Sequence, residues 1–116
     1  MRLRNVLIVA EDIEKAKEFY HDLFGLNVVR DFGENVILSE GLVLQERKTW
    51  ERLINASTVV GNASELFFEV CSFDTFVQKV REKQATVVAE PAENSWGRRV
   101  IRLKDPDGHL IEVAER

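Results

Sequence analysis

Four side chains that carry oxygen atoms could do chemistry in this chain: Asn5, Gln45, Glu65 and Glu112. Two amides and two carboxylates form an all-oxygen set, which suits hard divalent ions such as Mg, Mn or Ca better than Zn. Two carboxylates held close together without a metal repel each other, and one of their pKa values rises. Such a carboxylate is a candidate general base for proton abstraction, so Glu65 and Glu112 are the candidate catalytic residues.

Glu112 stands out within its own segment, DPDGHLIEV, at residues 105–113. Asp105 to Gly108 is a strong turn sequence, and His109 to Val113 is typical of a strand rich in branched residues. A carboxylate in the middle of an apolar strand is costly to bury alone. Glu112 therefore requires water, a partner side chain, a metal or a substrate.

The elements that position these side chains repeat at an offset of 60 residues. Residues 6–29 and residues 66–88 both run strand, cap, helix, strand, with Asp12 and Ser72 at the N-cap positions. Each helix has one apolar stripe, and Gly25 can end the first helix in the left-handed conformation. Three strand candidates follow each helix: Leu26–Asp31, Asn35–Ser39 and Leu42–Glu46, then Thr86–Ala89, Arg98–Leu103 and His109–Glu115.

The fold class predicted is α+β, with two βαβββ modules (about 1–55 and 62–116) that form a curled mixed-sheet cleft. Residues 47–64 connect the modules within a single domain of residues 1–116, and 49–54 could form a short helix. The helix covers one face of each sheet. Strand alternation places Asn5, Gln45, Glu65 and Glu112 on the other face, where they converge if the two sheets curl together.

Composition narrows the function classes. The net charge is −4 with no basic stripe, so nucleic acid is not an expected partner. The apolar run at residues 6–10 is too short for a signal peptide or a membrane span, and the single cysteine, Cys71, suits a reducing compartment. The prediction is a cytoplasmic protein with no membrane association.

Three segments resemble the vicinal oxygen chelate superfamily of glyoxalase I, bleomycin-resistance proteins and extradiol dioxygenases. They are EDIEKAKEFYHDLFGL (11–26), LFFEVCSFDTF (66–76) and WGRRVIRLKDPDGHLIEV (96–113). The resemblance covers nearly the whole chain. It implies paired βαβββ modules that form a cleft, often in a homodimer, with a divalent metal on the inner strands.

The same resemblance implies metal ligands at Asn5, Gln45, Glu65 and Glu112, the positions that strand alternation also selects. The metal enzymes of the superfamily typically place histidine at one or both of the Asn5 and Glu65 positions, and this chain has none at any of the four. The cofactor expected is a divalent metal (Mn, Mg, Ni or Zn) or none. A metal site, a metal-free binding cleft and a decayed site all stay open.

Five further residues are candidates for binding a small-molecule ligand: Phe67, Trp50, Trp96, Arg98 and Arg99. Aromatic side chains commonly wall ligand pockets, and arginines clamp carboxylates or phosphates. The alternatives are ordinary packing or a dimer seam for the aromatic residues and surface salt bridges for the arginines. Strand alternation puts Arg98 and Arg102 on one face and Arg99 on the other.

Two functions follow from this pattern. One is a glyoxalase-like, metal-dependent lyase or isomerase that acts on a small oxygen-bearing substrate. The other is a metal-free protein that sequesters a small molecule, as bleomycin-resistance proteins do. The missing histidines favour the second function, and the carboxylate at Glu112 with the amide at Gln45 favours the first.

Overall fold

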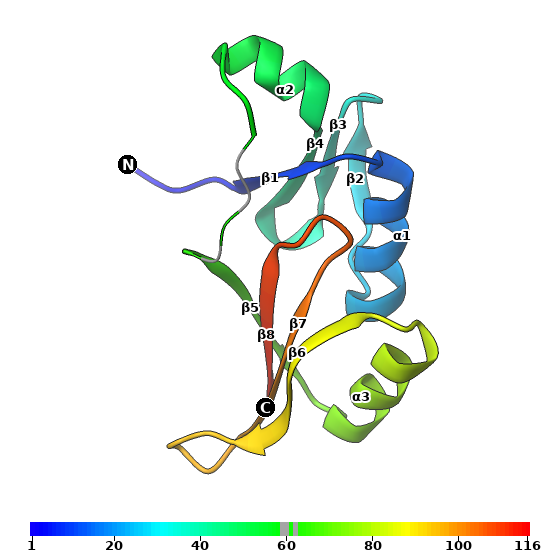
Figure 1. The fold of residues 1–116 in the computed structure, drawn as a ribbon, viewed down its shortest axis with the longest axis vertical. Coiled ribbons are helices and arrows are strands. Elements are labelled where there is room, and N and C mark those ends of the chain that lie inside the picture. Colours follow the sequence, from blue (N-terminus) through cyan, green and yellow to red (C-terminus); the bar gives the residue numbers. More distant parts are fainter. Residues whose placement is uncertain (59–60, 62) are drawn as a thin grey trace. The chain divides into compact units, whose positions relative to one another are not determined.

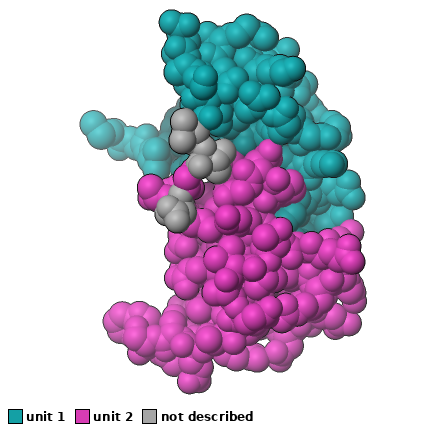
Figure 2. Space-filling model, in the orientation of Figure 1, with its two compact units in different colours: residues 1–59 teal, residues 60–116 magenta. Residues whose placement is uncertain are grey.

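The computed structural model describes residues 1–58, 61 and 63–116, and its chain divides into two compact units, residues 1–59 and 60–116 (Figure 2). Residue 62, where the second predicted module begins, lies outside the described residues.

Unit 1 runs from a strand through a helix to three further strands (Figure 1). Its elements are β1 (Val6–Ala10), α1 (Ile13–Phe24), β2 (Val28–Asp31), β3 (Asn35–Leu38), a short 3₁₀ turn (Ser39–Gly41), β4 (Leu42–Glu46) and α2 (Arg47–Ile54). The sheet has the order β1-β4-β3-β2, in which β1 and β4 are parallel and the other pairs are antiparallel.

Unit 2 repeats this plan. Its elements are β5 (Glu65–Val70), α3 (Phe73–Glu82), β6 (Thr86–Glu93), β7 (Arg99–Lys104) and β8 (Leu110–Glu115). The sheet has the order β5-β8-β7-β6, with β5 and β8 parallel and the other pairs antiparallel. Both sheets are open, and the α+β prediction of two βαβββ modules is confirmed.

The apolar stripes of the helices form the two cores, as their spacing predicts. In α1 the buried residues are Ala16, Tyr20 and Leu23, and in α3 they are Phe73, Phe76 and Val80. They pack over fully buried strand residues, among them Val36 and Leu44 in unit 1 and Ile101, Leu103, Ile111 and Val113 in unit 2. This burial removes apolar surface from water on one face of each sheet.

The helix ends show how far the repeat extends. Asp12 caps α1 by accepting a hydrogen bond from the Lys15 backbone N–H (3.1 Å), whereas Ser72 caps α3 without a side-chain bond. Gly25 ends α1 at φ 68°. The second module has no glycine there, and Gln84 adopts the left-handed φ of 54° instead.

Strand β6 is the main departure from the predicted elements. It continues four residues beyond Ala89, to Glu93, and includes Pro91. Proline lacks the N–H that a central strand needs, but β6 is an edge strand with two register shifts against β7. The edge position therefore accommodates the proline.

No helix in the described part of the chain is long and apolar enough to cross a membrane.

Candidate functional site

The parallel strands β5 and β8 bring Glu65 and Glu112 to one face of the unit 2 sheet. Phe67 lies directly opposite Glu112 in this pairing, and Glu65 is two residues earlier on β5. Residues two apart on a strand share a face, so all three side chains project the same way. Ile111 and Val113 alternate with Glu112 on β8, and they are fully buried on the side of α3. We call the opposite side, which carries Glu65, Phe67, Arg102 and Glu112, the glutamate face.

Arg102 of β7 joins the two carboxylates. Its Cα is the direct partner of Glu112 across the β7–β8 pair. Its Nη2 donates to Glu112 Oε2 over 3.1 Å, and its Nε donates to Glu65 Oε2 over 3.4 Å. Glu112 is the most enclosed of the three side chains, at 16% exposed, against 33% for Glu65 and 42% for Arg102. One guanidinium therefore serves two carboxylates.

The pKa of Glu112 is raised above its usual value. Burial is the largest cause, since it disfavours the charged carboxylate, and the hydrogen bond and negative charge of Glu65 act in the same direction. The positive charge of Arg102 opposes the rise. A carboxyl group held this way can take up and release a proton nearer to neutral pH than an exposed glutamate can, which is what a general acid or base requires.

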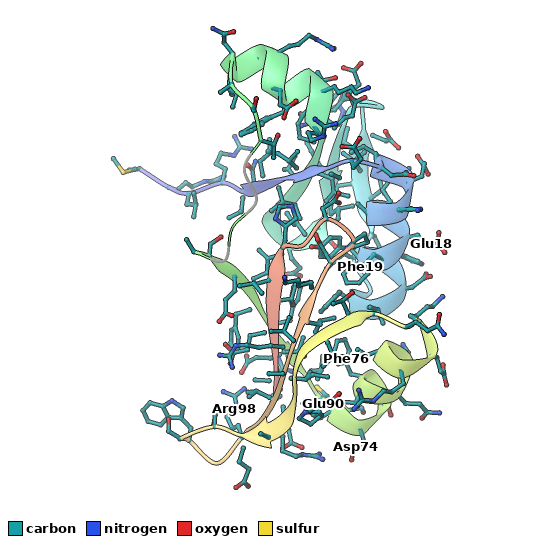
Figure 3. The ribbon with its side chains drawn as sticks, in the orientation of Figure 1. Glu18, Phe19, Asp74, Phe76, Glu90 and Arg98 are labelled. Atoms are coloured by element: carbon teal, nitrogen blue, oxygen red, sulfur yellow. The ribbon has the colours of Figure 1, made fainter. Side chains whose placement is uncertain are left out.

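The two arginines that precede Arg102 go to opposite faces, as strand alternation predicts. Arg98 (labelled in Figure 3) lies on the side of the glutamate face and donates to Glu69 Oε2 and to the Glu115 carbonyl. Arg99 lies against α3, where it donates to Asp74 (2.8 Å) and Glu115 (2.7 Å) and stacks over the Phe73 ring at 4.9 Å. Arg99 is thus committed to the packing of α3 on the opposite side of the sheet from Glu112.

The aromatic candidates lie in different surroundings. Phe67 is 54% exposed on the glutamate face beside Glu112. Trp96 is 84% exposed in the hairpin between β6 and β7, where Asn94 Oδ1 accepts bonds from the backbone N–H groups of Trp96 and Arg98 (3.0 Å each). Trp50 belongs to α2 of unit 1 and is half-buried. Phe67 alone among them is placed directly opposite a candidate catalytic residue.

In unit 1 the strand pairing separates Asn5 from Gln45. Gln45 lies opposite Val9, and Asn5 is four residues before Val9, a separation of about 13 Å at ~3.3 Å per residue. The Asn5 Cα instead lies near Gly41, 3.9 Å from where a Cβ on that glycine would sit. In unit 2 the residue opposite Glu112 is Phe67, and Glu65 is only two residues before Phe67. The halves therefore share a sequence repeat but differ in register by two residues.

The side chain of Gln45 already has a partner. It is only 5% exposed, and its Oε1 accepts a hydrogen bond from Asn35 Nδ2 over 2.8 Å. Asn35 lies directly opposite Gln45 on β3. This pairing satisfies the buried amide oxygen that the sequence marks as a candidate metal ligand.

The donor set of unit 2 does not fit a divalent metal as it stands. A hard ion such as Mg²⁺ needs one or two carboxylates that are free to face it, with waters completing its shell, whereas here a guanidinium already donates to both carboxylates of the pair. Across the described residues, no three His, Cys, Asp or Glu side chains gather closely enough to hold a metal ion. The four-residue ligand set stays a prediction.

Sequence reasoning missed Arg102 and Asn35 as partners of the candidate residues. Both follow from turn geometry. Asp105 and His109 close the β7–β8 turn through a backbone bond, and counting outward three residues from each reaches Arg102 and Glu112. In unit 1 the turn is centred on Glu40, and counting five residues outward in each direction reaches Asn35 and Gln45.

Comparison with known proteins agrees with this architecture. Residues 3–116 match the model of the glyoxalase-like domain. A probable lactoylglutathione lyase from Synechocystis sp. is 29% identical, over 99% of this chain and 95% of its own length. A crystal structure of a protein of unknown function from Agrobacterium tumefaciens is 32% identical with a TM-score of 0.88, over 100% of this chain and 94% of the other.

A glyoxalase/bleomycin resistance protein/dioxygenase family enzyme from Burkholderia phytofirmans shares the fold, with 22% identity, a TM-score of 0.83 and coverage of 97% and 96% of the two chains. The chain belongs to the glyoxalase-like domain family, within the vicinal oxygen chelate superfamily.

Proposed function

We propose that this chain binds a small oxygen-bearing molecule on the glutamate face of unit 2 and does so without a divalent metal. The observation that carries the proposal is the Arg102 guanidinium, which bridges Glu65 and Glu112. A cation that is part of the chain already balances much of the negative charge that would otherwise attract a metal. The absence of histidine from all four expected ligand positions supports the same conclusion.

Arg102, Glu112 and Phe67 would each make a different kind of contact with the ligand. Arg102 has five N–H donors, and the two bonds to Glu65 and Glu112 use only two of them. The others can donate to ligand oxygens in the paired geometry that guanidinium groups favour. Glu112 exchanges a proton or a hydrogen bond with the ligand, and exposed Phe67 provides an apolar surface next to it.

Metal content decides between this proposal and its rival. We expect mass spectrometry of untagged protein to find no stoichiometric metal, and we expect Mn, Mg, Ca, Ni and Zn to leave the melting temperature unchanged. Stoichiometric metal, or a large thermal shift that Glu112→Ala removes, would overturn the proposal. Native mass spectrometry of the same preparation then tests for a co-purified small molecule.

The second candidate function is a metal-dependent lyase or isomerase. The similarity to a probable lactoylglutathione lyase over nearly the full length of both chains favours it. In that case Glu65 or Glu112 moves a proton on the substrate, so Glu112→Gln abolishes turnover. Unchanged turnover in that variant would exclude this role for Glu112.

We also propose that the chain acts as a homodimer, because clefts in this superfamily are commonly completed by pairing. Light scattering across micromolar concentrations tests this, and a monomer throughout would contradict it.

A further inference from the structure

Two carboxylates on the glutamate face lie close enough to repel each other, and an arginine on the same face offsets this repulsion. Glu65 and Glu112 come from adjacent parallel strands, two residues apart in register, and the two carboxyl groups interact with each other. Glu112 is 16% exposed, so water screens its charge less than it would at the surface. Two such carboxylates need a cation between them or a shared proton.

Arg102 provides the cation from a third strand. Its position opposite Glu112 is fixed by the β7–β8 pairing, and its two hydrogen bonds point to different carboxylates. Arg98 offers a contrast in the same strand region, because it forms an ion pair with one carboxylate, that of Glu69. Among the residues that the structure describes, Arg102 is the cation that bridges the Glu65–Glu112 pair.

We propose that Arg102 is the built-in cation of this site. Its guanidinium takes the place between Glu65 and Glu112 that a divalent ion would need and keeps such ions out of the native chain. Removing that guanidinium converts the pair into a site for a hard divalent cation such as Mn²⁺. The inference rests on the metal independence proposed above and adds its physical cause.

The charges of this cluster oppose a divalent ion for as long as the guanidinium is present. Two carboxylates and one guanidinium carry a net charge of about −1, and a divalent ion approaching them is repelled by the arginine as well as obstructed by it. Without the guanidinium the same two carboxylates present about −2 and a vacated position within hydrogen-bond range of both. Carboxylate oxygens with water ligands are what Mn²⁺ and Mg²⁺ accept.

The test is Mn²⁺ titration of the full chain, followed by electron paramagnetic resonance, in which the signal of the free hydrated ion disappears on binding. A Mn²⁺ thermal-shift series on the same proteins is the second readout. Arg102→Met keeps the length and apolar stem of the side chain without its charge. Arg102→Gln provides a polar neutral alternative if the first variant fails to fold. Arg98→Met is the matched control, since it also removes one positive charge from this side of the sheet.

We expect Arg102→Met or Arg102→Gln to bind Mn²⁺ at least about tenfold more tightly than the wild-type chain, with a rise in melting temperature. Adding Glu112→Gln to either variant should abolish the gain, and Arg98→Met should show none.

If neither the wild-type chain nor the Arg102 variants bind Mn²⁺, this inference is wrong while the proposed metal-free function stands. If the wild-type chain binds Mn²⁺ as tightly as the variants, both fail. An equal gain in Mn²⁺ affinity in Arg98→Met would mean that the loss of any positive charge on this side of the sheet is enough, and it would also overturn the inference.

Discussion

Arg102 and Glu112 lie directly opposite each other on β7 and β8, and the arginine Nη2 donates to the glutamate Oε2 over 3.1 Å. Glu112 lies within an apolar strand, since Ile111 and Val113 on either side of it are fully buried. The contact with Arg102 gives this carboxylate the partner that such a position requires. Yet the same glutamate has a raised pKa, so burial and the neighbouring Glu65 outweigh the arginine. The folded chain therefore holds a proton on Glu112 more tightly than the unfolded chain does.

The effect of Glu112→Gln on the free energy of unfolding should consequently depend on pH. The substitution should be more favourable to the fold at neutral pH than in acid. Because the pKa of Glu112 is higher in the folded state than the ordinary glutamate value of about 4.5, its proton stabilises the fold below about pH 4.5, and this contribution is lost as pH rises through the folded-state pKa. Glutamine does not titrate and resembles the protonated carboxyl. The unfolding free energy of the variant minus that of the wild type should therefore increase between about pH 4 and pH 7.

Urea unfolding at a series of pH values measures this difference, with Glu90→Gln as the control. Glu90 pairs with Arg81, which lowers its pKa, so the same substitution there should give a difference that falls as pH rises. If the two variants showed the same pH dependence, the raised pKa of Glu112 would be contradicted.

The fold could be predicted from the sequence because several local patterns agreed. The helical stripes, the Asp12 cap, the Gly25 helix end and the turn at Asp105–Gly108 all lie where the sequence places them. Each depends on residues close together in the chain. Strand β4 even has the predicted bounds, Leu42–Glu46.

The candidate site could be predicted only in part, because strand register depends on pairing between distant segments. Alternation gives the face of a side chain, and it correctly separates Arg98 from Arg99. Alternation does not give the position along the partner strand. For that reason Asn5 and Gln45 share a face by alternation but stand four positions apart in the β1–β4 pairing.

The Asn35–Gln45 pair should be strongly coupled energetically. Asn35→Ala leaves the buried Gln45 oxygen without its 2.8 Å donor, which should cost about 1–3 kcal/mol of unfolding free energy. In Gln45→Leu the oxygen is gone, so the same Asn35→Ala change should then cost at least ~1 kcal/mol less. Urea unfolding of the two single variants and the double variant measures the coupling. A parallel cycle with exposed Asn27→Ala should be additive, and additivity in both cycles would count against the pair.

The two helix N-caps should respond differently to the same change. Asp12→Ala removes a bond from the cap side chain to the Lys15 N–H and should cost about 1 kcal/mol of unfolding free energy. Ser72→Ala removes no side-chain capping bond and should cost clearly less. Thermal unfolding of both variants is the measurement, and an equal loss of stability would mean that the capping bond of Asp12 contributes little.

Gly25 should be sensitive to substitution because of its backbone conformation and not because of crowding. It sits at φ 68°, where its N–H donates to the His21 carbonyl (2.9 Å) and the Leu26 N–H donates to the Tyr20 carbonyl (3.1 Å). A Cβ added at Gly25 would meet nothing within 4 Å. Gly25→Ala should therefore lower the unfolding free energy by about 1 kcal/mol through the left-handed conformation alone, and Gly25→Asn by less, since asparagine tolerates that region.

Gly61→Ala is the matched control for Gly25. A Cβ there also meets nothing within 4 Å, but Gly61 does not adopt a positive φ, so the change should stay within about 0.5 kcal/mol. Chemical denaturation of the three variants beside the wild-type chain gives the ranking. If Gly25→Ala and Gly61→Ala proved equally harmless, the left-handed end of α1 would not constrain the choice of residue, and Gly25 would mark the helix end without being needed for it.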